Sequence, residues 1–151
     1  MIDGVRVKPL AVHADDRGAL MEILRDDDGL LARFGQSTFT VAYPGVIKAF
    51  HRHARQDDLW FFVFGNARVV LHDMRPESAT HGETNVFCLG ELRRALVFIP
   101  RGVAHGYQVL GAEPCGLVYY TTEHYDPTSP DEERIPHDDP AIGFDWRIHP
   151  R

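Results

Sequence analysis

The chain has 151 residues, of which 44% are hydrophobic and 25% are charged. This composition is typical of one globular domain, expected over residues 1–151, and excludes intrinsic disorder. The formal net charge of −6 has the wrong sign for a phosphate-backbone binder, so we expect no nucleic-acid partner. No apolar run approaches the ~20 residues that span a bilayer, and the first residues lack a signal-peptide pattern, so we expect a cytoplasmic protein without membrane contact.

Short apolar or alternating runs recur between Gly, Pro, Asp and Asn residues along most of the chain. In chain order, these predicted strands cover residues 5–10, 19–24, 37–43, 46–51, 59–64, 67–73, 85–89, 95–99, 105–110 and 116–121. Regularly spaced strands with turn residues between them predict an all-β sandwich or barrel.

Two local signals predict departures from plain strands. Gly65 and Asn66 lie between two strongly apolar strands and predict a hairpin turn. Residues 28–34 form the one plausible helix, a short one that ends at Gly35.

The end of the chain has a different composition. From Pro114 onward it contains six of the ten prolines and an acidic cluster within residues 130–140, which predicts an irregular segment. Four apolar residues nevertheless alternate with polar or small ones, and we expect them to dock on the barrel: Ile142, Phe144, Trp146 and Ile148.

The two cysteines, Cys88 and Cys115, lie far apart in apolar strand-like surroundings and form no CxxC pair. We expect both to be reduced core residues.

Nine histidines is a high number, but most stand beside charges or turns. Six are expected at the surface: His13, His72, His81, His124, His137 and His149.

The other three histidines have a different context. His51 and His53 are two residues apart at the end of a strand, so their side chains project from one face. A Pro-x-Gly turn leads to His105 at the start of another strand, and Asp58 follows His53 closely. Three imidazoles and one carboxylate in one barrel would suit Fe, Ni, Mn or Zn.

These residues resemble the two motifs of the cupin superfamily. The first motif corresponds to Gly45, His51, His53, Asp58 and Gly65, with Asp58 in place of the usual glutamate. The second corresponds to Pro100, Gly102 and His105, with Val109 in place of its final asparagine. The resemblance implies a jelly-roll barrel with a mouth lined by His51, His53, Asp58 and His105.

A narrower resemblance extends over nearly the whole chain. Six blocks are similar in order and spacing to the dTDP-4-dehydrorhamnose 3,5-epimerase family: residues 15–24, 48–51, 59–75, 99–110, 119–127 and 138–146. The resemblance implies an isomerase that acts on a nucleotide-activated 4-keto sugar. It also implies a homodimer that exchanges edge strands, and no metal or organic cofactor.

The resemblance assigns roles to individual residues. His51 would remove a proton beside the ketone, and Tyr119 would return one to the opposite face. An imidazole with a pKa near ~6.5 and a phenol near ~10 suit these tasks. Substrate contacts are implied or suggested for Arg17, Glu22, Lys48, Arg52 and His105.

Three departures from the family pattern affect the expected mechanism. The family's active-site lysine, which helps to stabilise the enolate, corresponds to Asp58, and a glutamine-like residue corresponds to His53. The aspartate that orients the catalytic histidine falls beyond Arg151. We hypothesise that a divalent ion bound by His51, His53, Asp58 and His105 replaces the lysine as Lewis acid. In that case His51 cannot also be a free base.

Two further functional classes remain open at this stage. One is a metal-dependent cupin enzyme of another class, such as an isomerase, lyase or oxygenase. The other is a non-catalytic cupin that binds a sugar or its nucleotide. A cupin barrel by itself does not distinguish them, because this fold hosts many chemistries.

Overall fold

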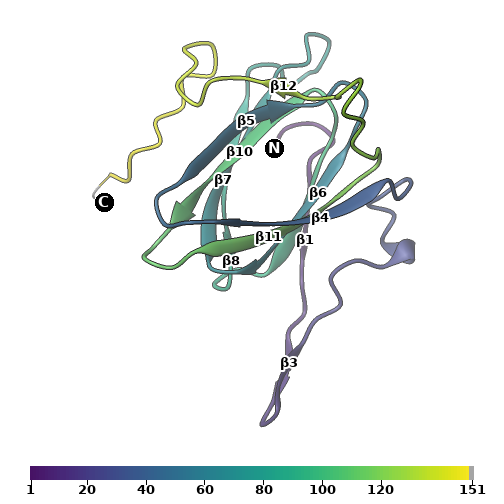
Figure 1. Cartoon of the computed structure of the whole chain (residues 1–151), viewed down its shortest axis with the longest axis vertical. Coiled ribbons are helices and arrows are strands. Elements are labelled where there is room, and N and C mark those ends of the chain that lie inside the picture. Colours follow the sequence, from purple (N-terminus) through teal and green to yellow (C-terminus); the bar gives the residue numbers. More distant parts are fainter. Residues whose placement is uncertain (150–151) are drawn as a thin grey trace.

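The computed structural model describes residues 1–149, which consist almost entirely of antiparallel β-strands (Figure 1). One five-stranded sheet has the order β1-β9-β6-β11-β4, and a second has the order β12-β5-β10-β7-β8. The sheets enclose a shared core, which confirms the predicted all-β jelly-roll fold. The last two residues of the predicted domain, 150–151, lie outside the described residues.

The strands observed agree closely with the predicted runs. The first sheet contains β1 (Arg6–Pro9), β9 (Ala95–Ile99), β6 (Asp58–Phe64), β11 (Cys115–Thr121) and β4 (Gln36–Ala42). The second contains β12 (Glu133–Arg134), β5 (Ile47–Arg52), β10 (Val103–Leu110), β7 (Asn66–Asp73) and β8 (Thr84–Gly90). A separate hairpin of β2 (His13–Asp15) and β3 (Gly18–Leu20) extends away from the barrel (Figure 1). The sequence did not predict β2 or β12, and the run at 19–24 is a strand only to Leu20.

Central strands are buried on both faces, which explains their continuous apolar sequences. On β6, Trp60 and Phe62 belong to the core between the sheets. Leu59 and Phe61 belong to a second cluster with Leu30, which covers the outer face of the first sheet. Sheets covered on both sides have strands without simple polar alternation.

The C-terminal segment packs on the outer face of the second sheet, as predicted. Trp146 is buried, and its ring centroid lies 5.4 Å from that of Phe50 on β5. Ile142 and Phe144 pack against the same cluster. Ile148 is exposed, so its predicted docking is wrong. The apolar contact with the barrel thus reaches Trp146 but not Ile148.

The predicted helix at residues 28–34 is not formed. The chain makes only a single 3₁₀ turn, η1 (Asp26–Asp28), followed by Gly29 in the left-handed conformation with φ 62°. The Asp28 carboxylate accepts hydrogen bonds from Lys8 Nζ at 2.5 Å and from the Arg25 backbone at 2.9 Å. These contacts and the burial of Leu30 against the first sheet favour an irregular course over a helix.

The predicted hairpin at Gly65 is also wrong. Gly65 joins β6 to β7, but these strands lie in different sheets and do not pair. A Cβ atom on Gly65 (φ 69°) would lie 2.4 Å from the carbonyl oxygen of Pro114. Gly65 therefore permits a close crossing between the sheets.

Two predictions about individual side chains need correction. Cys115 is buried, but Cys88 is exposed; both are free. His72, expected at the surface, is buried, and its Nδ1 lies 2.8 Å from Thr84 Oγ1. Within residues 1–149, no helix has the length and hydropathy needed to cross a membrane.

Candidate functional site

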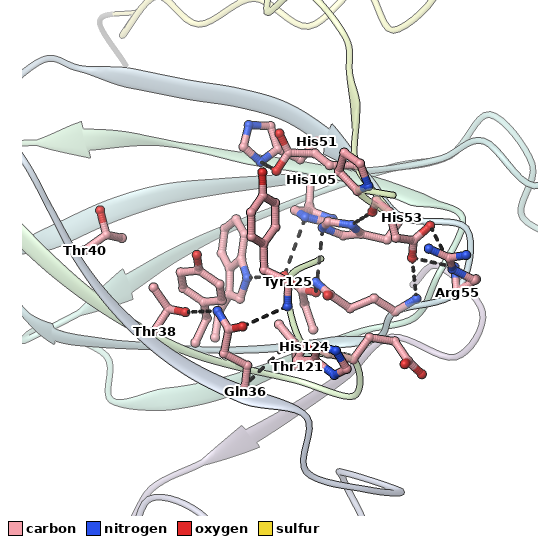
Figure 2. A pocket seen from close by; sticks show the side chains of 18 of the residues that line it. Gln36, Thr38, Thr40, His51, His53, Arg55, His105, Thr121, His124 and Tyr125 are labelled. Carbon is pink, nitrogen blue, oxygen red and sulfur yellow. Dashed lines mark hydrogen bonds and ion pairs between the residues drawn. The ribbon is translucent and has the colours of Figure 1, made fainter. Parts of the chain in front are cut away.

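A cavity of about 860 Å³ lies between the two sheets (Figure 2). Its wall includes residues of β4, β6 and β11 from the first sheet, β5 and β10 from the second, and the segment that follows β11. Six of the predicted site residues line this one cavity: Lys48, His51, His53, Asp58, His105 and Tyr119. The shared cavity expected from the sequence is therefore present.

Close packing of β5 against β10 positions the histidines. His51 is paired directly with His105, and the register shifts between His105 and Tyr107. A Cβ atom at Gly106 would lie 2.3 Å from Ala49 Cβ, which is far closer than atoms tolerate. The glycine thus allows the two strands to approach at the point where they present His51 and His105.

His51 is partly exposed in the cavity and has an acidic neighbour. Its Nδ1 atom lies 3.6 Å from Glu132 Oε2. Burial lowers the pKa of His51 below its usual value, and the Glu132 carboxylate partly opposes this shift. A neutral imidazole at neutral pH has the protonation state that a general base requires.

Three other site residues form a compact cluster at the wall of the cavity. His53, Asp58 and His105 are buried, and each offers a ligand atom such that all three atoms lie within 4.8 Å of one another. Burial lowers the pKa of His105 to about 4, against the opposing effect of the Asp58 carboxylate. His51, the fourth ligand predicted from the sequence, is outside this cluster.

The segment after β11 fixes one side of the cavity. The Asp131 carboxylate accepts hydrogen bonds from the backbone N–H groups of Ala54, Arg55 and Gln56, at 3.1, 2.8 and 2.9 Å. The Asp131 carbonyl oxygen contacts His53 Nδ1. The segment therefore holds both the chain after β5 and the ring of His53 (Figure 2).

Tyr119 and Lys48 lie on opposite sheets. Tyr119 is on β11, where it pairs with Trp60 of β6 and Thr38 of β4. Lys48 is on β5, and its Nζ donates hydrogen bonds to Thr40 Oγ1 at 3.0 Å and to the Val41 carbonyl at 3.3 Å. The ammonium group is thus held near the β4 wall of the cavity.

Three predicted substrate contacts are not brought to this cavity within one chain. Arg17 lies on the projecting β2–β3 hairpin, 85% exposed, and pairs with Asp15. Glu22 follows that hairpin and pairs with Arg25 at 3.2 Å. Arg52 does not line this cavity. It pairs with Glu133 and lines a separate cavity of about 490 Å³.

Sequence reasoning missed four residues that organise the site: Gln56, Trp60, Asp131 and Glu132. The acidic cluster within residues 130–140 predicts only an irregular segment. The apolar Ile135, three residues after Glu132, was the available signal that this segment packs on the barrel, but the partner of Glu132 could not be read from the sequence.

Residues 1–151 match the family model for dTDP-4-dehydrorhamnose 3,5-epimerase. The spore coat polysaccharide biosynthesis protein SpsL of Bacillus subtilis is 58% identical over 97% of both chains. A dTDP-4-dehydrorhamnose 3,5-epimerase of Methanothermobacter thermautotrophicus is 35% identical over 97% of this chain and 81% of its own.

A solved structure gives the same similarity in three dimensions. A dTDP-6-deoxy-D-glucose-3,5-epimerase from Legionella pneumophila, in complex with dTDP-4-keto-L-rhamnose, superposes with a TM-score of 0.87 and 28% identity. The match covers 99% of this chain and 81% of that one.

Proposed function

The chain belongs to the dTDP-4-dehydrorhamnose 3,5-epimerase family, and we propose that it epimerises carbons beside the ketone of a dTDP-linked 4-keto sugar. The observation that carries this proposal is the placement of a base and an acid on opposing sheets. His51 comes from β5 and Tyr119 from β11, and both line the same cavity.

Inversion of a carbon centre needs proton transfer on two faces. His51 takes the proton from the carbon beside the ketone, and the electron pair of the broken C–H bond moves into an enolate. Tyr119 then donates its phenolic proton to the opposite face of the same carbon. Because the two side chains approach from opposing sheets, a sugar held between them is deprotonated on one side and reprotonated on the other.

Glu132 acts as a positioning residue for His51. Its carboxylate lies 3.6 Å from Nδ1, just beyond hydrogen-bond distance, and its negative charge favours the tautomer with a proton on that atom. The other ring nitrogen, Nε2, then has the free electron pair that accepts the substrate proton. Glu132 thus provides a carboxylate that orients the ring of His51.

The nucleotide end of the substrate needs positive charge. Lys48, Arg55 and Arg134 all line the cavity, and Lys48 occupies the position where the resemblance puts a diphosphate-binding arginine. A carbohydrate-biosynthesis role agrees with the name of the Bacillus subtilis relative. The two free cysteines also agree with a reducing cytoplasm, where we place the enzyme.

The exposed hairpin and sheet edge support a homodimer. Large apolar side chains on or beside the edge strand β4 are exposed, among them Phe39, Val41 and Tyr43. The β2–β3 hairpin carries Arg17 away from its own barrel (Figure 1). We propose that the hairpin of one subunit reaches the cavity of the other, so that Arg17 and Glu22 contact the nucleotide bound there.

A deuterium-exchange experiment tests the function. The protein is incubated in D₂O with dTDP-linked 4-keto sugars, and deuterium beside the carbonyl is followed by NMR together with the configuration of each centre. We expect enzyme-dependent incorporation with inversion. Tight binding of several sugars without any exchange would instead indicate a non-catalytic binding protein.

A further inference from the structure

His53, Asp58 and His105 come together from both sheets. His53 directly follows β5, His105 lies on β10, and Asp58 begins β6. Their exposed fractions are 8%, 3% and 3%. Three potential ligand atoms within 4.8 Å of one another, in side chains so deeply buried, form a site built by the fold rather than an accidental surface cluster.

Both imidazoles are oriented by the backbone. His53 Nδ1 contacts the Asp131 carbonyl oxygen, and His105 Nδ1 lies 3.0 Å from the Val103 carbonyl oxygen. A ring nitrogen that faces a carbonyl oxygen must carry the proton, so Nε2 of each ring has a free electron pair. Metal-binding histidines are commonly held in this way, with the second nitrogen donating to a carbonyl or carboxylate.

The two Nε2 atoms face Asp58 without hydrogen-bonding to it. His53 Nε2 lies 3.9 Å from Asp58 Oδ1, and His105 Nε2 lies 3.8 Å from Oδ2. These separations exceed hydrogen-bond distance. The two imidazoles and the carboxylate would therefore hold a metal ion of the kind that takes nitrogen and oxygen ligands.

Asp58 also has the partners expected of a ligand carboxylate. Its oxygens accept hydrogen bonds from Gln56 Nε2 at 2.7 Å and from Trp60 Nε1 at 3.1 Å. Among residues 1–149, no lysine or arginine forms an ion pair with this buried carboxylate. A buried charge without such a partner is costly, and a bound cation would remove that cost.

We propose that His53, Asp58 and His105 bind one divalent transition-metal ion of the Fe, Ni, Mn or Zn class. Two imidazoles and one carboxylate suit these ions. His51 is not needed as a ligand and stays available as the base, which removes the conflict between the two roles. The catalytic use of the ion rests on the proposed epimerase function: held by these three residues, it would supply the positive charge that the resemblance assigns to a lysine at the position of Asp58.

Metal titration of the whole protein tests the site. Chelator-treated protein is titrated calorimetrically with Zn²⁺, Ni²⁺, Mn²⁺ and, without oxygen, Fe²⁺, and bound metal is counted by elemental analysis. We expect one ion per chain. The titration reaches about 1 mM of each ion, so only binding with a Kd above about 1 mM would go undetected. The proposal is overturned if the protein takes up none of the four ions.

Matched variants locate the ion. Asp58→Asn and His105→Gln keep side-chain size and should each weaken binding more than about 100-fold, because even residues that only orient a ligand contribute about 10–100-fold. His51→Gln and His72→Gln, outside the cluster, should bind as the wild type does. Thermal melting shows that each variant is folded. Wild-type affinity in both folded ligand variants contradicts the assignment.

The metal and the epimerase proposals fail in different ways. If metal-free protein exchanges deuterium at the rate of the metal-loaded protein, the ion has no catalytic role while the epimerase function stands. If the ion binds but no 4-keto sugar exchanges, the metal site stands and the function fails.

Discussion

The Glu132 carboxylate lies 3.6 Å from Nδ1 of His51, across the junction between the segment after β11 and strand β5. This contact connects an irregular acidic segment to the proposed base. It depends on the short ladder between β12 and β5, in which Glu133 pairs with Arg52 and Arg134 with His51. The segment therefore takes part in the site rather than merely covering it.

We predict that Glu132→Gln shifts the pH dependence of deuterium exchange. The carboxylate raises the pKa of His51, so its removal should lower that pKa further and move the acidic limb of the profile to lower pH. Loss of the oriented tautomer should also reduce kcat by about 10-fold or more, a part of what a positioned base contributes. A lower kcat with an unmoved acidic limb would argue against a direct effect on His51. Glu133→Gln, which pairs with Arg52 instead, is the control.

His51→Gln and Tyr119→Phe should separate the two proton transfers. The first should reduce deuterium exchange by about 10²–10⁴-fold, because it removes the base. The second should reduce formation of the inverted sugar more than exchange, since His51 can still remove a proton and return a deuteron to the same face. Both are measured by NMR in D₂O. Equal loss of exchange and inversion in Tyr119→Phe would assign the acid role to another residue.

Mixed dimers should restore activity if the site is shared between subunits. We predict that Arg17→Ala and His51→Gln homodimers are both impaired, the first through weaker dTDP binding. In a heterodimer, the subunit with intact His51 receives the hairpin with intact Arg17, so one site is complete. Co-purified heterodimers with two different tags are assayed against each homodimer. Activity no higher than the sum of the homodimers would contradict strand exchange.

Gly106→Ala should destabilise the protein and disturb the site together. The new methyl group would lie 2.3 Å from Ala49 Cβ, so β5 and β10 must separate at the His51–His105 pair. Overpacking of this kind costs about 1–3 kcal/mol in the free energy of unfolding, measured by denaturant titration. Adding Ala49→Gly should restore only part of it, because Ala49 Cα would still lie 2.7 Å away. Full stability of Gly106→Ala would show that the strands are not tightly constrained here.

Asp73 should make stability depend on acid pH. Burial alone would raise its pKa, but hydrogen bonds from Arg75, Ser78 and Thr80 outweigh this effect and hold the pKa well below its usual range. Because the folded-state pKa is the lower one, the stabilisation is present above the unfolded value of about 3.9 and is lost as pH falls below it. Asp73→Asn should cost about 2–3 kcal/mol at neutral pH.

Acid titration provides the check on that assignment. The difference in the free energy of unfolding between wild type and Asp73→Asn should shrink as the pH falls through about 4 towards the lower folded-state pKa. A difference that stays constant over this range would mean that packing, not charge, accounts for the effect.

Sequence patterns and the family resemblance together predict the strands, the barrel and six of the residues that line the cavity. Apolar runs such as 59–64 and 95–99 predict strands because each must bury its side chains in a pleated sheet, whatever the partner. The spacing of His51 and His53, and the turn before His105, also predict side chains that converge on one cavity. The local sequence around Tyr119 fits an ordinary core tyrosine equally well. Only the family resemblance indicates a catalytic role for it.

Which of those residues touch depends on how the two sheets pack. Gly65 and Asn66 predict a hairpin locally, yet packing places β6 and β7 in different sheets. The pairing of Glu132 with His51, and the exclusion of His51 from the cluster of His53, Asp58 and His105, depend on segments far apart in the chain. A local pattern indicates whether a side chain must be buried or exposed. The distance between two residues that are far apart in the chain depends instead on how whole sheets pack.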